Sequence, residues 1–110
     1  MKITKKQVAI LLNPKDDVAT ALTQLAAGQT VNVTLDDGNT SVTCTTELRE
    51  DIQFGHKYAL RDIAQGEPIL KYGLPIGNAL EDIPAGAWVH VHNCRSEHLG
   101  FQHEKYGIKA

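Results

Sequence analysis

A chain of 110 residues with 42% hydrophobic and 22% charged residues fits one globular domain with a single modest core. Its formal net charge of −2, with scattered lysines and arginines, argues against a nucleic-acid partner, because phosphate binding needs a basic face. No apolar run approaches the roughly 20 residues of a membrane span or forms a signal peptide. We therefore expect a cytoplasmic protein, with no membrane partner, in which Cys44 and Cys94 are reduced.

The N-terminal segment predicts one strand and one short helix. Residues 8–12 are apolar throughout and predict a buried strand. A helix is expected next, with Asp16 or Asp17 as its N-cap and Gly28 just after its end. Its apolar face consists of residues spaced three and four apart, namely Val18, Ala21, Leu22 and Leu25.

The rest of the chain predicts short strands separated by turns. Apolar and polar residues alternate over 31–35 and again over 41–46, with turn residues at 36–39, which predicts a β-hairpin. In the second half of the chain the glycines are too closely spaced for a long helix, and short strands fit residues 68–72 and 87–92.

One pattern recurs: an apolar anchor, a two-residue bend, a glycine and the start of a strand. Residues 62–69 resemble residues 82–89, and residues 24–31 form a weaker third copy. The pattern predicts a tight turn, in which we expect Gly66 or Gly86 to have a positive φ or no room for a Cβ atom. The aspartate that opens each of the two better copies is expected to hydrogen-bond its local backbone.

The sequence Trp-Val-His-Val-His-Asn at residues 88–93 is the most informative stretch for chemistry. On a strand, Val89 and Val91 face one way, and His90 and His92 face the other way, about 7 Å apart. Such an imidazole pair can bind a metal or an anion, but a metal needs a third ligand that the sequence does not identify. The alternative is a half-exposed strand with solvated histidines.

Two lysines lie in or next to predicted loops. Lys57 can bind a carboxylate as a point charge, and the adjacent His56 can donate a proton or a hydrogen bond. Lys71 alternates with its apolar neighbours and so leaves their face. Each of these residues can equally be an ordinary surface residue. The sequence contains no nucleophile motif and no phosphate-binding loop.

Taken together, these motifs closely resemble one family over residues 10–93. They read NPxDDVAxAL from Asn13, GHKxAL from Gly55, DIxxGEPIxKYGxxIGxA from Asp62 and DIxxGxxVHVHN from Asp82. They resemble the SAF (antifreeze-protein-like) domain of the altronate and galactarate dehydratases. The resemblance implies a β-clip fold, mainly β with one short helix, over residues 8–94, and a C-terminal tail or linker over residues 95–110.

The resemblance also implies a function. The chain is expected to be the small subunit or N-terminal domain of a sugar-acid hydro-lyase, a carbon–oxygen lyase that eliminates water. It would contribute a lid and substrate-gripping residues to an active site shared with a larger catalytic subunit, and it would be inactive alone. The complete enzyme is expected to use a divalent metal of the iron or manganese type, with none certain in this chain.

By the same resemblance, the candidate substrate-binding residues are His56, Lys57, Lys71, Tyr72, His90, His92 and Asn93. His90 and His92 are also the candidate metal ligands, while no catalytic residue is assigned. Four alternatives stay open: the small subunit of a sulfolactate sulfo-lyase, a noncatalytic module that binds a carbohydrate or anion, a metalloenzyme that acts alone through His90 and His92, and a chaperone-type SAF domain. The missing signal peptide counts against the last one.

Overall fold

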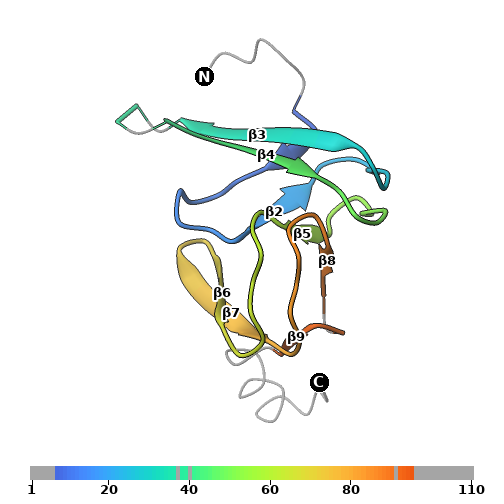
Figure 1. The fold of residues 1–110 in the computed structure, drawn as a ribbon. Helices are drawn as coiled ribbons and strands as arrows, with labels where there is room; N and C mark the ends of the chain where they lie inside the picture. The colour runs from blue at the N-terminus through green and yellow to red at the C-terminus, as the bar shows by residue number, and fades with distance from the viewer. Residues whose placement is uncertain (1–6, 37, 40, 91, 96–110) are drawn as a thin grey trace, which may run out of the picture.

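The computed structural model describes residues 7–36, 38–39, 41–90 and 92–95, and every regular element within these ranges is a β-strand (Figure 1). The strands are β1 (Ala9–Ile10), β2 (Val18–Ala21), β3 (Thr30–Asp36), β4 (Ser41–Glu47), β5 (Lys57–Ala59), β6 (Pro68–Lys71), β7 (Leu74–Ala79), β8 (Trp88–Val89) and β9 (Cys94–Arg95). Among the described residues, there is no helix with the length and apolar character needed to cross a membrane.

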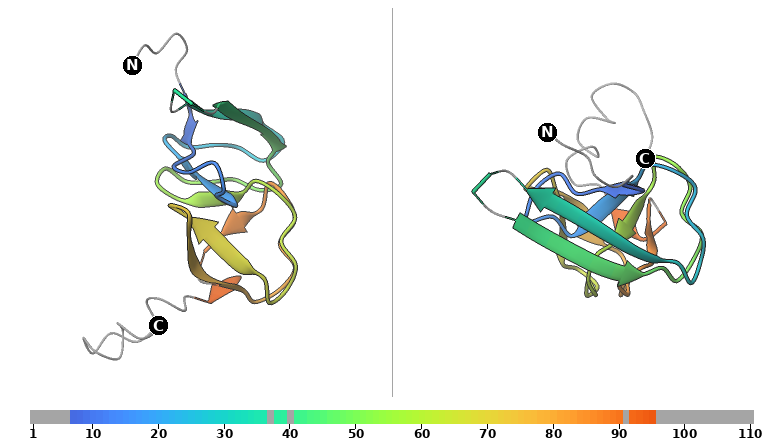
Figure 2. Two further views of the ribbon diagram at one scale, coloured as in Figure 1. Left: turned by 90° about the vertical axis from the view of Figure 1, so that its left-hand side faces the viewer. Right: turned by 90° about the horizontal axis from the view of Figure 1, so that it is seen from above.

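The strands form three antiparallel sheets stacked in layers. The central sheet has the order β1-β2-β5-β8, with the β3–β4 hairpin on one side and a β6-β7-β9 sheet on the other. Figure 2 shows, from above, the β3–β4 hairpin lying across the strands beneath it. The predicted fold class, a small mainly-β domain of the β-clip type, is confirmed.

Two hydrophobic cores lie on opposite faces of the central sheet, because side chains alternate along each strand. On β5, Tyr58 enters the first core and Ala59 the second, and on β8, Val89 enters the second core while Trp88 packs against the first. The first core consists of Ala9, Leu11, Ala19, Ala21, Leu25, Val31, Val33, Leu48, Ile52 and Tyr58. The second consists of Val18, Ala59, Ile63, Ile69, Ala79, Ile83, Ala87 and Val89.

Several predicted strands are confirmed. The hairpin pairs residues 30–36 with 41–47, although residues 37 and 40 of its turn region lie outside the described residues. The strand predicted at 8–12 is present over Ala9–Ile10, but it is not buried throughout as predicted, because Ile10 and Leu12 are exposed. The strand predicted at 68–72 is β6. The predicted tail lies outside the described residues from residue 96 onward.

The predicted helix after Asp17 is wrong, because residues 18–21 form the strand β2. Val18 packs in the second core, whereas Ala19 and Ala21 pack in the first, so this strand is buried on both faces. A strand buried on both faces has apolar residues at nearly every position. Such a run also contains the spacings of three and four that suggest a helix.

The two predicted N-cap aspartates do not cap a helix and instead accept hydrogen bonds from residues far along the chain. The carboxylate of Asp17 accepts the Leu70 N–H at 2.9 Å and the Arg61 Nε–H at 2.8 Å. Asp16 accepts the N–H groups of the two residues at the tip of the β6–β7 hairpin. These buried carboxylates therefore connect the segment before β2 to the β6-β7-β9 sheet.

The repeated turn occurs four times within the described ranges, once more than predicted. The glycines at its third position all have positive φ, namely Gly28 (85°), Gly55 (85°), Gly66 (88°) and Gly86 (89°). In each turn, the residue after the glycine donates its N–H to the carbonyl three residues earlier, at 3.0–3.1 Å. The additional copy has the sequence Asp-Ile-Gln-Phe-Gly, which matches the Asp-Ile-x-x-Gly signature of the two better copies.

The turns associate in pairs, and their aspartates act across each pair. Ile63 and Ile83 exchange two backbone hydrogen bonds of 2.7 Å. Asp62 accepts the N–H of Ala85 in the opposite turn, and Asp82 accepts an N–H of the first turn, both at 2.9 Å. The prediction that these aspartates bond their own local backbone is therefore wrong.

The two predicted turn glycines allow a matched test. Both Gly66 and Gly86 have positive φ, but a Cβ atom at Gly66 meets open space, whereas one at Gly86 collides with the Glu47 carbonyl oxygen. Gly66→Ala is expected to lower the free energy of unfolding by about 1–2 kcal/mol, the cost of a left-handed backbone. Gly86→Ala is expected to cost roughly 1–3 kcal/mol more, because the backbone of residues 47–49 must shift. Urea denaturation followed by circular dichroism checks this order, and equal losses would contradict it.

Candidate functional site

One turn and one strand place two candidate residues side by side. The turn at Gly55 leads directly into β5, so His56 and Lys57 follow a rigid bend. β5 lies between β2 and β8, and Lys57 is opposite Thr20 on one side and Val89 on the other. The backbone carbonyl of His56 accepts the N–H of the β2 residue Ala21 at 2.8 Å. Both candidates are therefore held by backbone hydrogen bonds and are half-buried.

Three imidazole rings gather around a single indole, and we refer to His56, Trp88, His90 and His92 as the Trp88 cluster. The His90 ring stacks on the indole with a centroid distance of 5.1 Å and an interplanar angle of 9°. The His92 and His56 rings lie 4.9 and 5.5 Å from it. The indole N–H donates to Nδ1 of His56 at 3.0 Å. Sequence reasoning brought the histidines into the site but did not assign Trp88 to it.

A turn sets the position of the last two histidines. The strand predicted over 87–92 ends at Val89, since the N–H groups of Asn93 and Cys94 both donate to the carbonyl of His90. His90 and His92 consequently do not alternate along a strand as predicted, and Val91 lies outside the described residues. The polar groups at the end of β8 bond within this turn instead of continuing the sheet.

The predicted site residue Asn93 holds this turn together. Its side chain is buried, with 3% exposure. Its Oδ1 accepts the His90 N–H at 2.9 Å, and its Nδ2 donates to the Trp88 carbonyl at 2.7 Å. Asn93 therefore fixes the backbone from which the Trp88 cluster extends. Direct contact between Asn93 and a substrate stays a prediction.

Positive groups lie close together beside the Trp88 cluster. Burial, and then the charge of Lys71, lower the pKa of Lys57. Burial, and then the charges of Lys57 and the two other histidines of the cluster, lower the pKa of His90. Among the residues that the structure describes, the Lys57 side chain has no hydrogen-bond or carboxylate partner. Such an arrangement favours binding of an anion, which would supply the missing negative charge.

The remaining candidates, Lys71 and Tyr72, lie at the end of β6 and in the tip of the β6–β7 hairpin, which consists of Tyr72 and Gly73. Tyr72 and Gly73 have φ angles of 59° and 74°, the signs of a type I′ turn. The carboxylate of Asp16 accepts both of their N–H groups, at 3.0 and 2.8 Å. The Lys71 Nζ lies 4.8 Å from the centroid of the Tyr72 ring, which is largely exposed. A tyrosine with positive φ is strained, and such strain is often found at functional sites.

The described residues of the site contain no complete set of metal ligands. No group of three or more histidine, cysteine, aspartate or glutamate side chains that could hold a metal is found in the described part of the chain. Nδ1 of His56 already accepts the indole N–H. Metal binding by His90 and His92 stays a prediction, and these two residues need further ligands from outside the described residues.

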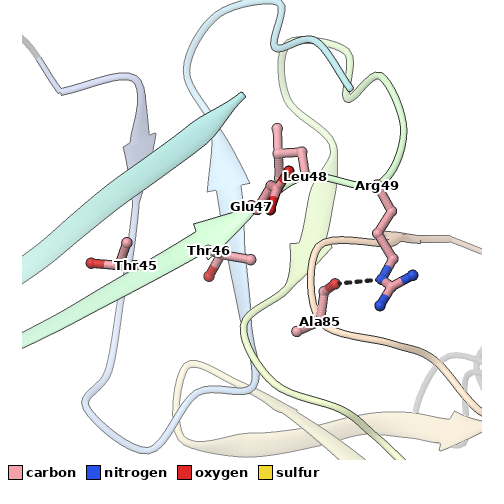
Figure 3. A pocket seen from close by; sticks show the side chains of 6 residues that line it. All are labelled: Thr45, Thr46, Glu47, Leu48, Arg49 and Ala85. Carbon is pink, nitrogen blue, oxygen red and sulfur yellow. Dashed lines mark hydrogen bonds between the residues drawn. The ribbon is translucent and has the colours of Figure 1, made fainter. Parts of the chain in front are cut away.

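A groove of about 570 Å³ lies elsewhere, between the end of β4 and the turn at Ala85 (Figure 3). None of the predicted site residues lines it. The side chain of Arg49 extends toward Ala85, and its Nε–H donates to the Ala85 carbonyl at 3.2 Å. The lining residues are Thr45, Thr46, Glu47, Leu48, Arg49 and Ala85.

Comparisons with known proteins agree with the motifs. A family profile described as the altronate/galactarate dehydratase SAF domain matches residues 7–97. The chain is 51% identical over 87 residues to the altronate dehydratase of Escherichia coli (strain K12), and 34% identical over 87 residues to that of Bacillus subtilis (strain 168). Both alignments cover 79% of this chain and 16% of the relative. The chain therefore spans about one sixth of the length of these enzymes.

A second kind of relative is shorter. The chain is 41% identical over 51 residues to the (2R)-sulfolactate sulfo-lyase subunit alpha of Chromohalobacter salexigens. This alignment covers 46% of the chain and 54% of that subunit.

The strained tyrosine predicts a gain in stability on substitution. Tyr72→Asn gives the Asn-Gly pair preferred in type I′ turns, and we expect the free energy of unfolding to rise by about 1 kcal/mol. The variant Tyr72→Phe keeps the strain and the ring, so its stability should equal that of the parent chain. Urea denaturation of the three proteins measures this, and a loss of stability in Tyr72→Asn would show that packing of the tyrosine outweighs its strain.

Proposed function

The chain belongs to the altronate/galactarate dehydratase SAF domain family, and we propose that it is the substrate-gripping part of a sugar-acid hydro-lyase. The observation that carries this proposal is Lys57, which is half-buried, is repelled by Lys71 and has no carboxylate partner among the described residues. A sugar acid has a carboxylate that needs a cationic partner and several hydroxyl groups that need hydrogen bonds.

The candidate residues divide naturally between these two needs. Lys57 and Lys71 are suited to the carboxylate, because its charge would relieve the repulsion between them. The histidines of the Trp88 cluster are suited to hydroxyl groups, since each ring offers a donor or an acceptor. Tyr72, at the exposed tip of a hairpin, can contact the substrate or the surface that faces it. The domain thus binds and orients the substrate.

The rest of the active site would come from a larger catalytic region. The chain spans 16% of the altronate dehydratases that it matches, and a relative named as a subunit shows that similar small chains occur separately. Closure of the domain over that region would exclude water and complete the set of acid–base groups. The complete enzyme would use a divalent metal of the iron or manganese type, and His90 and His92 would need further ligands from that region to bind it.

A sulfolactate sulfo-lyase subunit is the second candidate, favoured by the 41% identity to such a subunit alpha. Lys57 and Lys71 would suit sulfolactate, which carries a carboxylate and a sulfonate. A module that only binds an anion is the noncatalytic alternative. It would bind sugar acid without changing the rate of any reaction.

The first test is reconstitution. The purified chain with Fe²⁺ or Mn²⁺ and altronate or galactarate is expected to show no dehydration, because a domain of this size does not enclose the substrate. Addition of the catalytic region of an altronate dehydratase should restore dehydration, measured by the appearance of the keto-deoxy acid. Robust turnover by the chain alone would contradict the proposal, as would turnover of sulfolactate in place of both sugar acids.

The second test removes one charge. Because burial opposes the charged form of Lys57, Lys57→Met is expected to leave the melting temperature unchanged or higher. It should raise the KM of the reconstituted enzyme about 10- to 100-fold, the loss expected for one charge-assisted hydrogen bond. The exposed lysine variant Lys15→Met serves as the control, with both quantities unchanged. A collapse of the fold in Lys57→Met would assign this lysine to structure.

A further inference from the structure

We propose that Trp88 is a positioning residue that fixes His56 as the neutral tautomer with its proton on Nε2. His56 then presents a hydrogen-bond donor, and not a base, to the site beside Lys57. The part of this inference that concerns a bound sugar acid rests on the proposed function. The tautomer itself does not.

The argument begins with the direction of one hydrogen bond. Nε1 of Trp88 lies 3.0 Å from Nδ1 of His56. An indole nitrogen can only donate, so Nδ1 of the imidazole must accept and carries no proton. A neutral imidazole has one protonated and one unprotonated nitrogen. The proton of neutral His56 is therefore on Nε2, the nitrogen that the indole leaves free.

Backbone hydrogen bonds and ring packing both restrain the donor. The backbone N–H of Trp88 donates to Oε2 of Glu50 at 3.0 Å, and the backbone carbonyl of Trp88 accepts from Nδ2 of Asn93 at 2.7 Å. The residue is paired with Tyr58 in the central sheet. The His90 ring stacks on the indole face, and the indole packs against the first core. Trp88 is thus a rigid donor aimed at one ring nitrogen.

This geometry limits what His56 can do. To act as a base through Nε2, the ring would need its proton on Nδ1, which would place two N–H groups against each other at 3.0 Å. In the observed arrangement the Nε2–H can donate to a substrate carboxylate or hydroxyl oxygen. The group that removes the α-proton in the proposed dehydration is then a residue other than His56. In proteins, the hydrogen bond that one histidine nitrogen makes commonly determines whether the other nitrogen is protonated.

The test uses nuclear magnetic resonance on the ¹⁵N-labelled chain at a pH where the histidines are neutral. The chain has a single tryptophan, so its indole N–H gives one signal. We expect a scalar coupling between this nitrogen and Nδ1 of His56, together with ¹⁵N shifts that show a proton on Nε2 alone. A proton on Nδ1, or a mixture of the two tautomers, overturns the proposal without any variant.

Two variants separate positioning from general structure. Trp88→Phe keeps an aromatic ring but removes the donor, and it should give a measurable fraction of the Nδ1–H tautomer. Tyr58→Phe removes a buried hydroxyl that has no partner among the described residues, on the residue paired with Trp88, and should leave the tautomer unchanged. An unchanged tautomer in folded Trp88→Phe would overturn the positioning role.

The part that concerns substrate is tested in the reconstituted enzyme with galactarate or altronate. The Nε2–H signal of His56 should shift on binding, and Trp88→Phe should reduce both this shift and the affinity. An identical response in the parent chain and in Trp88→Phe overturns the donor role. Failure of the reconstituted enzyme to dehydrate either acid would overturn the proposed function instead, and would leave the tautomer result standing.

Discussion

Pairing between tight turns satisfies much of the backbone of this domain. Four of its strands have only two or three residues, so ladders alone leave many N–H and C=O groups without partners. Leu25 and Ile52 exchange two hydrogen bonds of 2.8 and 2.9 Å, as Ile63 and Ile83 do at 2.7 Å. Each turn glycine also donates its N–H to a carbonyl outside its own turn. Positive φ at these glycines is what makes the arrangement possible, and the three sheets are connected through it.

The same turns assemble the candidate site. The turn at Gly55 leads into His56 and β5, and the turn at Gly86 leads into β8, which pairs with β5. Residues that are 32 positions apart in the sequence therefore come into hydrogen-bond contact, as Trp88 and His56 do. The buried carboxylate of Asp16 fixes the tip of the β6–β7 hairpin, which carries the candidate residue Tyr72. The site is thus built on rigid elements, which is how precise binding geometry is usually achieved.

Sequence reasoning succeeded where the signal is local. Period-two alternation identified the β3–β4 hairpin, and the glycine pattern identified the repeated turn. It failed at β2, because apolar spacing does not separate a helix from a strand buried on both faces. It also failed at Asp16 and Trp88, whose partners are distant in sequence and become neighbours only through sheet pairing. The candidate residues were found from motifs, but their grouping depends on long-range contacts that no motif contains.

Three unfavourable features of this domain fall on the candidate site residues. A half-buried lysine beside another lysine, a histidine whose charged form is opposed by its neighbours, and a tyrosine with positive φ all belong to the candidate site. The favourable features are the two cores and the paired turns. Deviations from local rules are expected at functional sites, where the rest of the fold compensates for them. An anion would reverse the electrostatic part of this cost, and this is the physical basis of the proposed binding of a sugar acid. A structural role alone gives no reason to keep these positive charges together.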